Sequence, residues 1–406
     1  MTGVWSLAAL WLGLALVATL LSIWLGVATA LSEIVVGTVA QLLIGVFVGK
    51  ALLGTGEPWV TFLSGTGAII LTFLAGAELD PVVFRSKWKE TTGIGLVGFF
   101  APFLGCTAFA LYGLHWTPRA SWLAGVALST TSVAVVYAVV LELGLNSTDF
   151  GKAILAACFV NDLGTVIALG LIFAPFTVKT VAFIVVSVVV LGALPWVTPR
   201  FFRRYGGRPS ELEAKFLLLA LFGMGALASW AESEPVLPAY LIGMVLAGTV
   251  GKDHALVRRL RTVTFGLLTP FYFIRAGSFV SVPALLAAPV SVLGLLMAKL
   301  VTKSIGVWPA TRFFRYPRQE AAYTTLLMST GLTFGSISAL FGLTHGVIDQ
   351  AQYSFLIAAV IGSAVVPTVI ANAFFLPRYL LPKPSRAPEV TSAATREAVG
   401  STEETA

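Results

Sequence analysis

Asn161 and Asp162 lie side by side in the middle of an apolar stretch that runs from Ala153 to Pro175. This stretch is long enough to cross a lipid bilayer, which takes roughly 20 residues of helix. An ionised carboxylate at such a depth costs roughly several kcal/mol unless it is protonated, paired or bound to a cation. A buried acid in this position is a functional candidate. We therefore predict that Asp162 exchanges a proton for a monovalent metal cation.

Two hydrophilic runs interrupt other apolar stretches, and both begin with Ser-Thr. The first is Ser129 to Ser132, and the second is Ser329 to Ser336, 200 residues later. Helices that break at the bilayer midplane are typical of transporters with internal repeats. Alternatively, these hydroxyls bond to carbonyls of the preceding turn or pack helices closely. Because the two runs occupy matching positions in a repeat, we favour broken helices, with unwound backbone near Thr130, Gly331 and Thr333.

The residues around the first break and the acid could form a cation site. Hard monovalent cations require several oxygen ligands, which hydroxyls, amides and carbonyls freed by unwinding can supply. We expect Thr131, Ser132 and Asn161 to provide such oxygens around Asp162. The sequence thus predicts one ion- and proton-binding site, with Asp162 as its only charged metal ligand.

Two lysines lie in another apolar stretch, near 285–307. Lys299 and Lys303 are four residues apart, so they share one face of a helix. Buried cations need an acidic or backbone partner, and Lys303 could pair with Asp162 when that site is empty. Alternatively, Lys303 could extend its ammonium group to the membrane interface.

Composition defines the elements that must position these residues. Hydrophobic residues make up 57% of the 406-residue chain, charged residues only 11%, and the mean hydropathy is +0.91. The apolar runs are continuous rather than alternating, which favours helices over a β-barrel. The sequence predicts an all-α polytopic membrane protein with about thirteen spans. They lie near 5–27, 31–50, 59–79, 92–114, 121–143, 152–175, 178–197, 214–231, 236–250, 262–280, 285–307, 320–343 and 350–375.

The net charge of +7 reflects topology rather than nucleic-acid binding, because the basic residues gather in alternate connections. By the positive-inside rule these connections are cytoplasmic. The N-terminus is then outside, the C-terminus is cytoplasmic, and the protein is expected in the cell inner (plasma) membrane. The basic residues are Arg85, Lys87, Lys89, Arg200, Arg203, Arg204, Arg208, Lys252, Arg258, Arg259, Arg261, Arg312, Arg315, Arg318, Arg378, Lys383 and Arg386.

The spans also form a repeat. Spans two to six and nine to thirteen are two sets of five, and the odd offset between the sets gives them opposite topologies. This arrangement is typical of inverted-repeat transporters. The two hydrophilic runs then fall in corresponding helices, which we expect to cross as discontinuous helices.

Several motifs together resemble the monovalent cation:proton antiporter superfamily, in its second branch of bacterial sodium/proton antiporters and potassium-efflux-like transporters. Residues 76–81 read Gly-Ala-Glu-Leu-Asp-Pro, similar to a family segment after the third span. Residues 128–134 resemble the first unwound helix, and Asn161-Asp162 matches the position of the acidic pair. Lys303 precedes Arg312 by nine residues, as a basic residue does in the family, and is a better match than Lys299. The resemblance covers nearly all of residues 5–380.

The resemblance implies a sodium/proton antiporter fold, a homodimer and an elevator-type movement that carries Asp162 between the two faces. It assigns a transporter domain to 1–383. Within that domain, a mobile core covers approximately 121–175 and 285–375, and a dimer scaffold covers approximately 5–80 and 214–280. Lys303 would stabilise the core or couple the movement to binding. Residues 384–406 lack an apolar run, and we expect a disordered cytoplasmic tail without a nucleotide-binding regulatory domain.

Three departures from the family pattern bear on the mechanism. Many sodium-transporting relatives carry Asp-Asp, whereas this chain has Asn161 before Asp162. With one carboxylate, the proton-loaded and cation-loaded states have equal charge, which predicts electroneutral 1:1 exchange. Leu332 replaces a glutamate that many relatives have, and Arg275 adds a cation in a span. We therefore group Arg275 with Lys299 and Lys303 as core-stabilising or coupling residues.

Other functions remain open at this level. The main alternatives are a channel-like potassium efflux protein and a sodium-coupled organic solute carrier of the same fold. Intramembrane enzyme chemistry at Asp162 is the least favoured class, because aspartyl catalysis needs two carboxylates in one site. We expect no enzyme activity, no cofactor and no nucleic-acid partner. Na⁺ is favoured over K⁺ as the transported cation.

Overall fold

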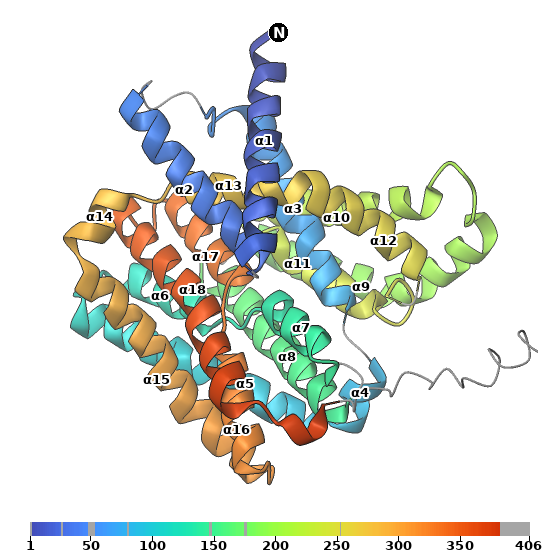
Figure 1. The fold of residues 1–406 in the computed structure, drawn as a ribbon. Coiled ribbons are helices and arrows are strands. Elements are labelled where there is room, and N and C mark those ends of the chain that lie inside the picture. Colours follow the sequence, from blue (N-terminus) through green and yellow to red (C-terminus); the bar gives the residue numbers. More distant parts are fainter. Residues whose placement is uncertain are drawn as a thin grey trace, which may run out of the picture.

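The computed structural model describes residues 2–25, 27–47, 53–78, 81–145, 148–173, 177–251 and 253–381. Leu79 and Asp80 of the 76–81 motif, Lys252 and the expected tail at 384–406 lie outside these ranges. Within them the chain is helical and contains no strand, so the all-α fold class is confirmed (Figure 1).

The first half of the chain forms a series of long helices with one broken helix. These elements are α1 (Thr2–Leu25), α2 (Thr29–Phe47), α3 (Pro58–Ala77), α4 (Pro81–Ser86), α5 (Trp88–Ala108), the π-helix η1 (Phe109–Gly113), α6 (Pro118–Ser129), α7 (Val133–Glu142), α8 (Asp149–Ile172) and α9 (Val178–Tyr205).

The second half repeats this pattern after a shorter pair of helices. Its elements are α10 (Leu212–Trp230), α11 (Val236–Leu246), α12 (His254–Val263), the π-helix η3 (Thr264–Leu268), α13 (Thr269–Ser278), α14 (Val282–Ala287), α15 (Pro289–Phe313), α16 (Arg318–Met328), α17 (Thr333–Thr344), α18 (Gln350–Ile370), the π-helix η4 (Ala371–Phe375) and the 3₁₀-helix η5 (Arg378–Leu380).

The predicted spans agree with these elements. In the described part of the chain, ten helices are long and apolar enough to cross a membrane, and two shorter apolar helices lie in α2 and α11. The remaining predicted span, 262–280, coincides with η3 and α13. The sequence predicts a connection at 251–261, but most of it belongs to α12, whose buried Leu256 and Leu260 lie one turn apart. The short helices α4 and α14 were not predicted.

Two broken helices cross next to each other. α6 ends at Ser129 and α7 begins at Val133, whereas α16 ends at Met328 and α17 begins at Thr333. The Ser132 backbone N–H donates to the Thr330 carbonyl over 3.1 Å, which joins the two breaks directly. The crossed discontinuous helices of the predicted fold are therefore present.

Glycines bring the N-terminal helices into close contact with the second half. A Cβ on Gly37 of α2 would lie 2.2 Å from the Ile274 carbonyl oxygen of α13, and one on Gly277 would lie 2.0 Å from that of Ile34. The Thr38 hydroxyl is within hydrogen-bond distance of the carbonyls of both Ile34 and Gly277. Such small-residue contacts let helix backbones approach closely in membranes. They join α2 and α13 tightly.

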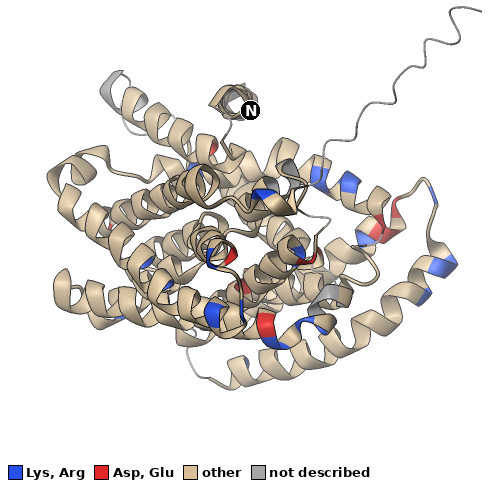
Figure 2. Cartoon of the chain, turned by 60° about the horizontal axis from the view of Figure 1, so that its bottom comes forward, with Lys and Arg blue, Asp and Glu red and all other residues tan. Residues whose placement is uncertain are grey.

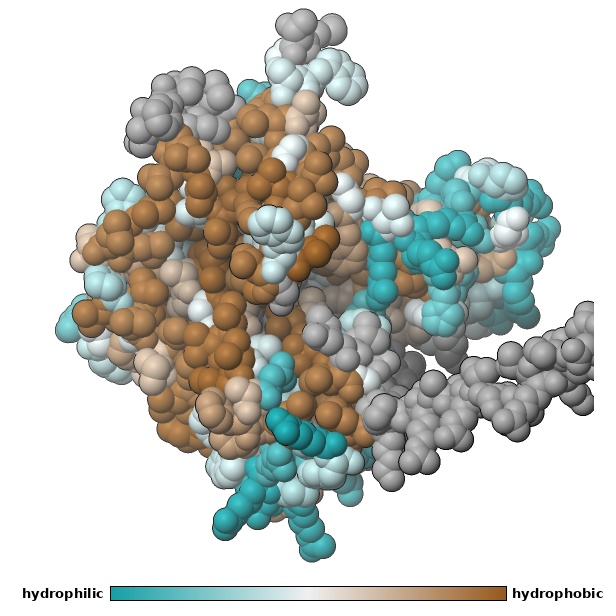
Figure 3. All heavy atoms as spheres, viewed as in Figure 1, coloured by the Kyte–Doolittle hydropathy of each residue, from teal (hydrophilic) through white to brown (hydrophobic). Residues whose placement is uncertain are grey.

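The surface separates into apolar and polar regions. In the face that Figure 3 shows, a broad apolar area covers the long helices, and hydrophilic side chains gather at one end and over the arm formed by α9 and α10. Charged residues lie mainly at helix ends and in connections (Figure 2). This distribution fits a multi-pass membrane protein.

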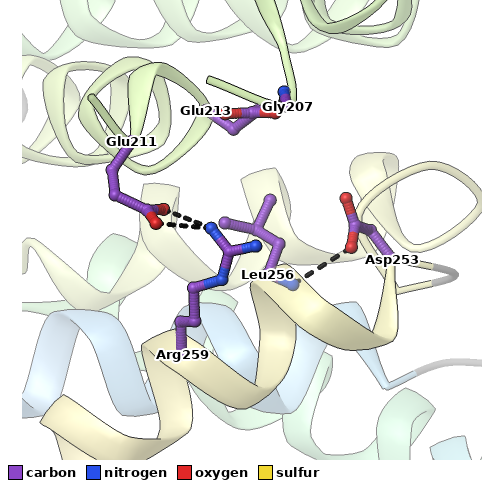
Figure 4. A network of polar contacts seen from close by, with 6 residues as sticks. All are labelled: Gly207, Glu211, Glu213, Asp253, Leu256 and Arg259. Atoms are coloured by element: carbon purple, nitrogen blue, oxygen red, sulfur yellow. Dashed lines mark hydrogen bonds and ion pairs between the residues drawn. The ribbon is translucent and has the colours of Figure 1, made fainter. Parts of the chain in front are cut away.

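A polar network ties that arm to α12 (Figure 4). Both carboxylate oxygens of Glu211 accept hydrogen bonds from Arg259 Nη1, at 2.5 and 2.6 Å. Asp253 caps α12 by accepting from the Leu256 N–H at 3.0 Å. Glu213 accepts from the Gly207 N–H at 2.6 Å. Because Arg259 and Glu211 are both about half exposed, the pair contributes little net stability.

Candidate functional site

Asp162 lies in the interior of α8 and is 1% exposed. Thr148 caps this helix by accepting from the Gly151 N–H at 3.1 Å. Neither carboxylate oxygen of Asp162 has a hydrogen-bond partner among the residues that the structure describes. The backbone of Thr131 lies near this carboxylate. A buried carboxylate with unused oxygens can accept a proton or ligate a cation.

The first break lies against this acid. Thr130 and Thr131 are fully buried, and Ser132 is 1% exposed. The Thr131 hydroxyl donates to the Met328 carbonyl at 2.8 Å, at the end of α16. Thr130 instead bonds back to the Ala127 carbonyl at 3.2 Å, as Ser and Thr side chains in helices commonly do. Both predicted arrangements therefore occur at neighbouring residues. Thr131 bonds across to the other broken helix, and Thr130 bonds to the preceding turn of its own helix.

Lys303 joins the first break to α8. Its Nζ donates to Thr131 Oγ1 at 2.9 Å and to Asn161 Oδ1 at 3.2 Å. The side chain is completely buried, so it does not extend to the membrane interface. No ion pair within 4.0 Å connects it to Asp162 among the described residues. Lys303 thus contacts the neutral member of the Asn161-Asp162 pair, and the Asn161 amide nitrogen has no hydrogen-bond partner in the described part of the chain.

Lys299 lies beside the second break. Its Nζ donates to Ser363 Oγ of α18 at 3.0 Å. The Ser363 hydroxyl in turn lies 2.8 Å from the Val360 carbonyl and 3.3 Å from the Gly331 carbonyl. Thr333 begins α17 nearby and is 8% exposed, while Leu332 is buried. The structure therefore brings eight predicted residues to one region of the core: Asp162, Asn161, Thr131, Ser132, Thr130, Lys303, Lys299 and Gly331.

Arg275 lies elsewhere. Its Nε donates to the Thr55 carbonyl at 2.9 Å, and its guanidinium group stands 5.3 Å from the centre of the Phe279 ring. These contacts attach α13 to the segment that precedes α3, and neither joins Arg275 to Asp162. The structure does not bring Arg275 to the core site with which the sequence grouped it.

The sequence reading missed several residues. Ser363 was not singled out, because one serine in an apolar helix is common in membranes. The Met328 carbonyl and the Tyr240 hydroxyl, which donates to the Phe159 carbonyl at 3.0 Å, also escaped notice. Glu33 of α2 is a second buried carboxylate, 2% exposed. An acid four residues into an apolar run was the signal for it.

The donor set fits an alkali cation rather than a transition metal. Among the described residues, no cluster of three or more His, Cys, Asp or Glu side chains could hold a metal ion. The polar groups of the core are one carboxylate, hydroxyls, an amide and helix-end carbonyls, which are oxygen ligands suited to hard cations.

The fold is that of a membrane antiporter. It is similar to the solved structure of the sodium proton antiporter MjNhaP1 from Methanocaldococcus jannaschii at pH 8, with a TM-score of 0.67 and 14% identity. The match covers 92% of this chain and 96% of that structure. At this identity the similarity establishes the fold.

The family model described as "Sodium/hydrogen exchanger, transmembrane" matches residues 9–376. The chain therefore belongs to the sodium/hydrogen exchanger family, within the monovalent cation:proton antiporter superfamily.

The relatives are named for the transport of different cations. The Probable Na(+)/H(+) antiporter 3 of Methanocaldococcus jannaschii is 25% identical over 352 residues, covering 83% of this chain and 89% of that protein. The Glutathione-regulated potassium-efflux system protein KefC of Cronobacter sakazakii is 26% identical over 380 residues, covering 86% and 59%. Cation/H(+) antiporter 18 of Arabidopsis thaliana is 24% identical over 373 residues, covering 84% of this chain. The chain spans only 46% of that plant relative's length.

Proposed function

We propose that this protein is a secondary active antiporter that exchanges a monovalent cation for a proton, with Asp162 binding each in turn. The observation that carries the proposal is the buried Asp162 carboxylate, whose two oxygens lack partners beside a helix break. A proton or a cation satisfies these oxygens, and either state removes the cost of a bare buried charge.

Na⁺ is the favoured cation, and K⁺ is the second candidate. Four of the relatives are named Na(+)/H(+) antiporters, one each from Methanocaldococcus jannaschii and Enterococcus hirae and two from Synechocystis, whereas KefC is named for potassium efflux. The proposed ligands beside Asp162 are Thr131, Ser132 and the Asn161 side chain. A sodium-coupled organic solute carrier remains the alternative within the same fold.

The exchange is proposed to be electroneutral. Lys303 donates to Asn161, which cannot ionise, and not to Asp162. The core would therefore cross the membrane with the same net charge whether Asp162 holds a proton or a monovalent cation. One proton would move for each cation, and the exchange would be insensitive to membrane potential.

The movement is proposed to be of the elevator type. The breaks share a backbone hydrogen bond, Lys303 of α15 donates to Thr131 of the first break, and Lys299 donates to Ser363 of α18. These links favour a core of α6–α8 and α15–α18 that moves as one body. The close helix contacts of α2 with α13 favour a separate scaffold. In the proposed assembly the scaffold forms a homodimer, and the C-terminus is cytoplasmic.

The test uses purified protein in liposomes that contain a pH dye. Na⁺ or K⁺ is added outside, with the potential clamped or free. We expect Na⁺-driven alkalinisation inside to vanish in Asp162→Asn and to ignore voltage. Absence of any cation-linked proton flux in the wild type would refute antiport. Voltage-dependent exchange would keep antiport and refute the electroneutral stoichiometry.

A further inference from the structure

Lys299 is not among the proposed ligands of the cation or the proton, although it is a fully buried cation. Within the part of the chain that the structure describes, no carboxylate lies within 4.0 Å of its ammonium group. A buried charge without a counter-ion is costly. It therefore needs compensation from neutral oxygens or from oriented backbone dipoles.

The second break supplies this compensation. α16 ends at Met328, so the carbonyls of its last turn are directed into the break and carry partial negative charge. Lys299 Nζ is bonded to Ser363 Oγ at 3.0 Å, and the Ser363 hydroxyl lies 3.3 Å from the Gly331 carbonyl. The ammonium group thus lies beside Gly331, three residues after the end of α16.

Gly331 leaves the space that the ammonium group fills. A Cβ at this position would lie 2.1 Å from Lys299 Nζ, 2.8 Å from Thr130 Oγ1 and 3.3 Å from Ser363 Oγ. Groups from α15, from the first break and from α18 therefore meet at one point. Any side chain at 331 would displace at least one of them.

A chain of contacts connects this point to the proposed ligands. Thr330 precedes Gly331, and its carbonyl accepts from the Ser132 N–H at 3.1 Å. The Met328 carbonyl accepts from the Thr131 hydroxyl at 2.8 Å. The second break is thus bonded to two residues that we place around the cation, and Lys299 lies against this break beside Gly331 and Ser363.

We infer that Lys299 is a positioning residue of the exchange, a tethered cation that holds the second break so that Thr131 and Ser132 face the cation at Asp162. This inference rests on the proposed function. It adds that affinity for the transported cation depends on a lysine that does not touch the cation. Leu332 supplies no negative charge at this break. The positive charge of Lys299 is therefore compensated by the end of α16 and by Ser363.

The test compares Lys299→Met with Lys299→Arg and with a matched control on the same helix. Thr311→Val is suitable as the control, because Thr311 is also buried in α15, and among the described residues its hydroxyl bonds only to the Trp308 carbonyl of its own helix, at 2.8 Å. Two quantities are measured. They are the KM and maximal rate of cation-driven proton flux in liposomes, and hydrogen–deuterium exchange of the backbone at 328–333 in detergent.

We expect Lys299→Met to raise the cation KM roughly tenfold or more, the effect of losing one charged hydrogen bond, with a smaller change in maximal rate. Amide exchange at 328–333 should become faster. Lys299→Arg should restore part of the KM, and Thr311→Val should change neither quantity. A KM that is unchanged or lower in Lys299→Met would overturn the inference, since a lower value would mean that Lys299 acts only by repelling the cation.

Two controls keep the outcomes separate. Ser363→Ala leaves Lys299 in place and removes its acceptor, so it should raise the KM in the same direction if Lys299→Met fails to fold. An unchanged KM in Ser363→Ala would then contradict the inference. If the wild type itself shows no cation-linked flux, the proposed function fails. The amide exchange of the break still tests whether Lys299 holds it.

Discussion

Asn161→Asp tests the proposed stoichiometry most directly. The substitution places a carboxylate oxygen at the position of Asn161 Oδ1, 3.2 Å from Lys303 Nζ. At an effective dielectric constant of about 20, the attraction between the two charges is about 5 kcal/mol. Desolvation of the new carboxylate costs roughly several kcal/mol. Because these contributions nearly offset each other, we expect the melting temperature to change little.

The transport cycle should change much more. A second carboxylate beside Asp162 can bind a second proton when the cation leaves, so that one net charge crosses the membrane in each cycle. One elementary charge across about 100 mV corresponds to about 2.3 kcal/mol. This energy equals roughly a 50-fold change in the cation gradient at equilibrium, since each 1.36 kcal/mol is about tenfold.

The assay measures the cation gradient at which proton flux in liposomes reverses, at zero potential and at about 100 mV. We expect the reversal point of the wild type to be the same at both potentials and that of Asn161→Asp to move. Asn161→Ala removes the acceptor for Lys303 without adding charge, and its reversal point should stay fixed. A voltage-dependent wild type would mean that Lys303 itself exchanges a proton. If the cation gradient at reversal in Asn161→Asp did not change with potential, residue 161 would not bind a transported proton.

Three further predictions concern stability. Burial raises the pKa of Glu234, in the connection between α10 and α11, to about 7. The folded protein therefore holds the proton of this side chain more tightly than the unfolded chain does. The resulting contribution to the free energy of unfolding is fully present below pH 4.5 and is lost as the pH rises through about 7. Glu234→Gln should remove this pH-dependent fall in melting temperature, which corresponds to about 2 kcal/mol when partial exposure of the side chain is allowed for. If the melting temperature fell equally with pH in both proteins, burial of Glu234 would not be the cause. Gly277→Ala should destabilise by about 3 kcal/mol because its Cβ would lie 2.0 Å from the Ile34 carbonyl oxygen, whereas Gly223→Ala meets nothing within 4 Å and should stabilise α10 by up to about 1 kcal/mol in thermal unfolding. Glu211→Ala should cost less than about 1 kcal/mol in the same assay, since its pair with Arg259 is about half exposed, and a larger loss would show that the network of Figure 4 holds the arm in place.

The sequence was sufficient for the fold because membrane helices follow from local rules. Continuous apolar runs of bilayer length predict spans, and hydroxyl-rich interruptions at 129–132 and 329–336 predict the breaks. Each of these signals depends only on neighbouring residues. The sequence did not predict α12, because its arginines are typical of a polar connection. Only Leu256 and Leu260, which are buried on one face of the helix, indicate a helix there.

The sequence could not assign partners to the buried cations, because partners depend on how helices are rotated and stacked. Lys299 and Lys303 share a helix face, yet four residues of helix separate them by about 6 Å along the axis. That distance is enough to place one at each break. Arg275 looked equivalent as a base within an apolar run. It differs because α13 packs on α2 and directs the guanidinium to the Thr55 carbonyl.

The arrangement of charge at the two breaks also explains why a single acid can serve this core. Each break exposes carbonyls at the end of its first half-helix, and these carry partial negative charge. Lys303 donates to the Thr131 hydroxyl at the first break, and that hydroxyl donates to the Met328 carbonyl. Lys299 reaches the second through Ser363. Because both ammonium groups donate to neutral oxygens, neither forms an ion pair with Asp162 among the described residues, which leaves the carboxylate available for the proposed exchange.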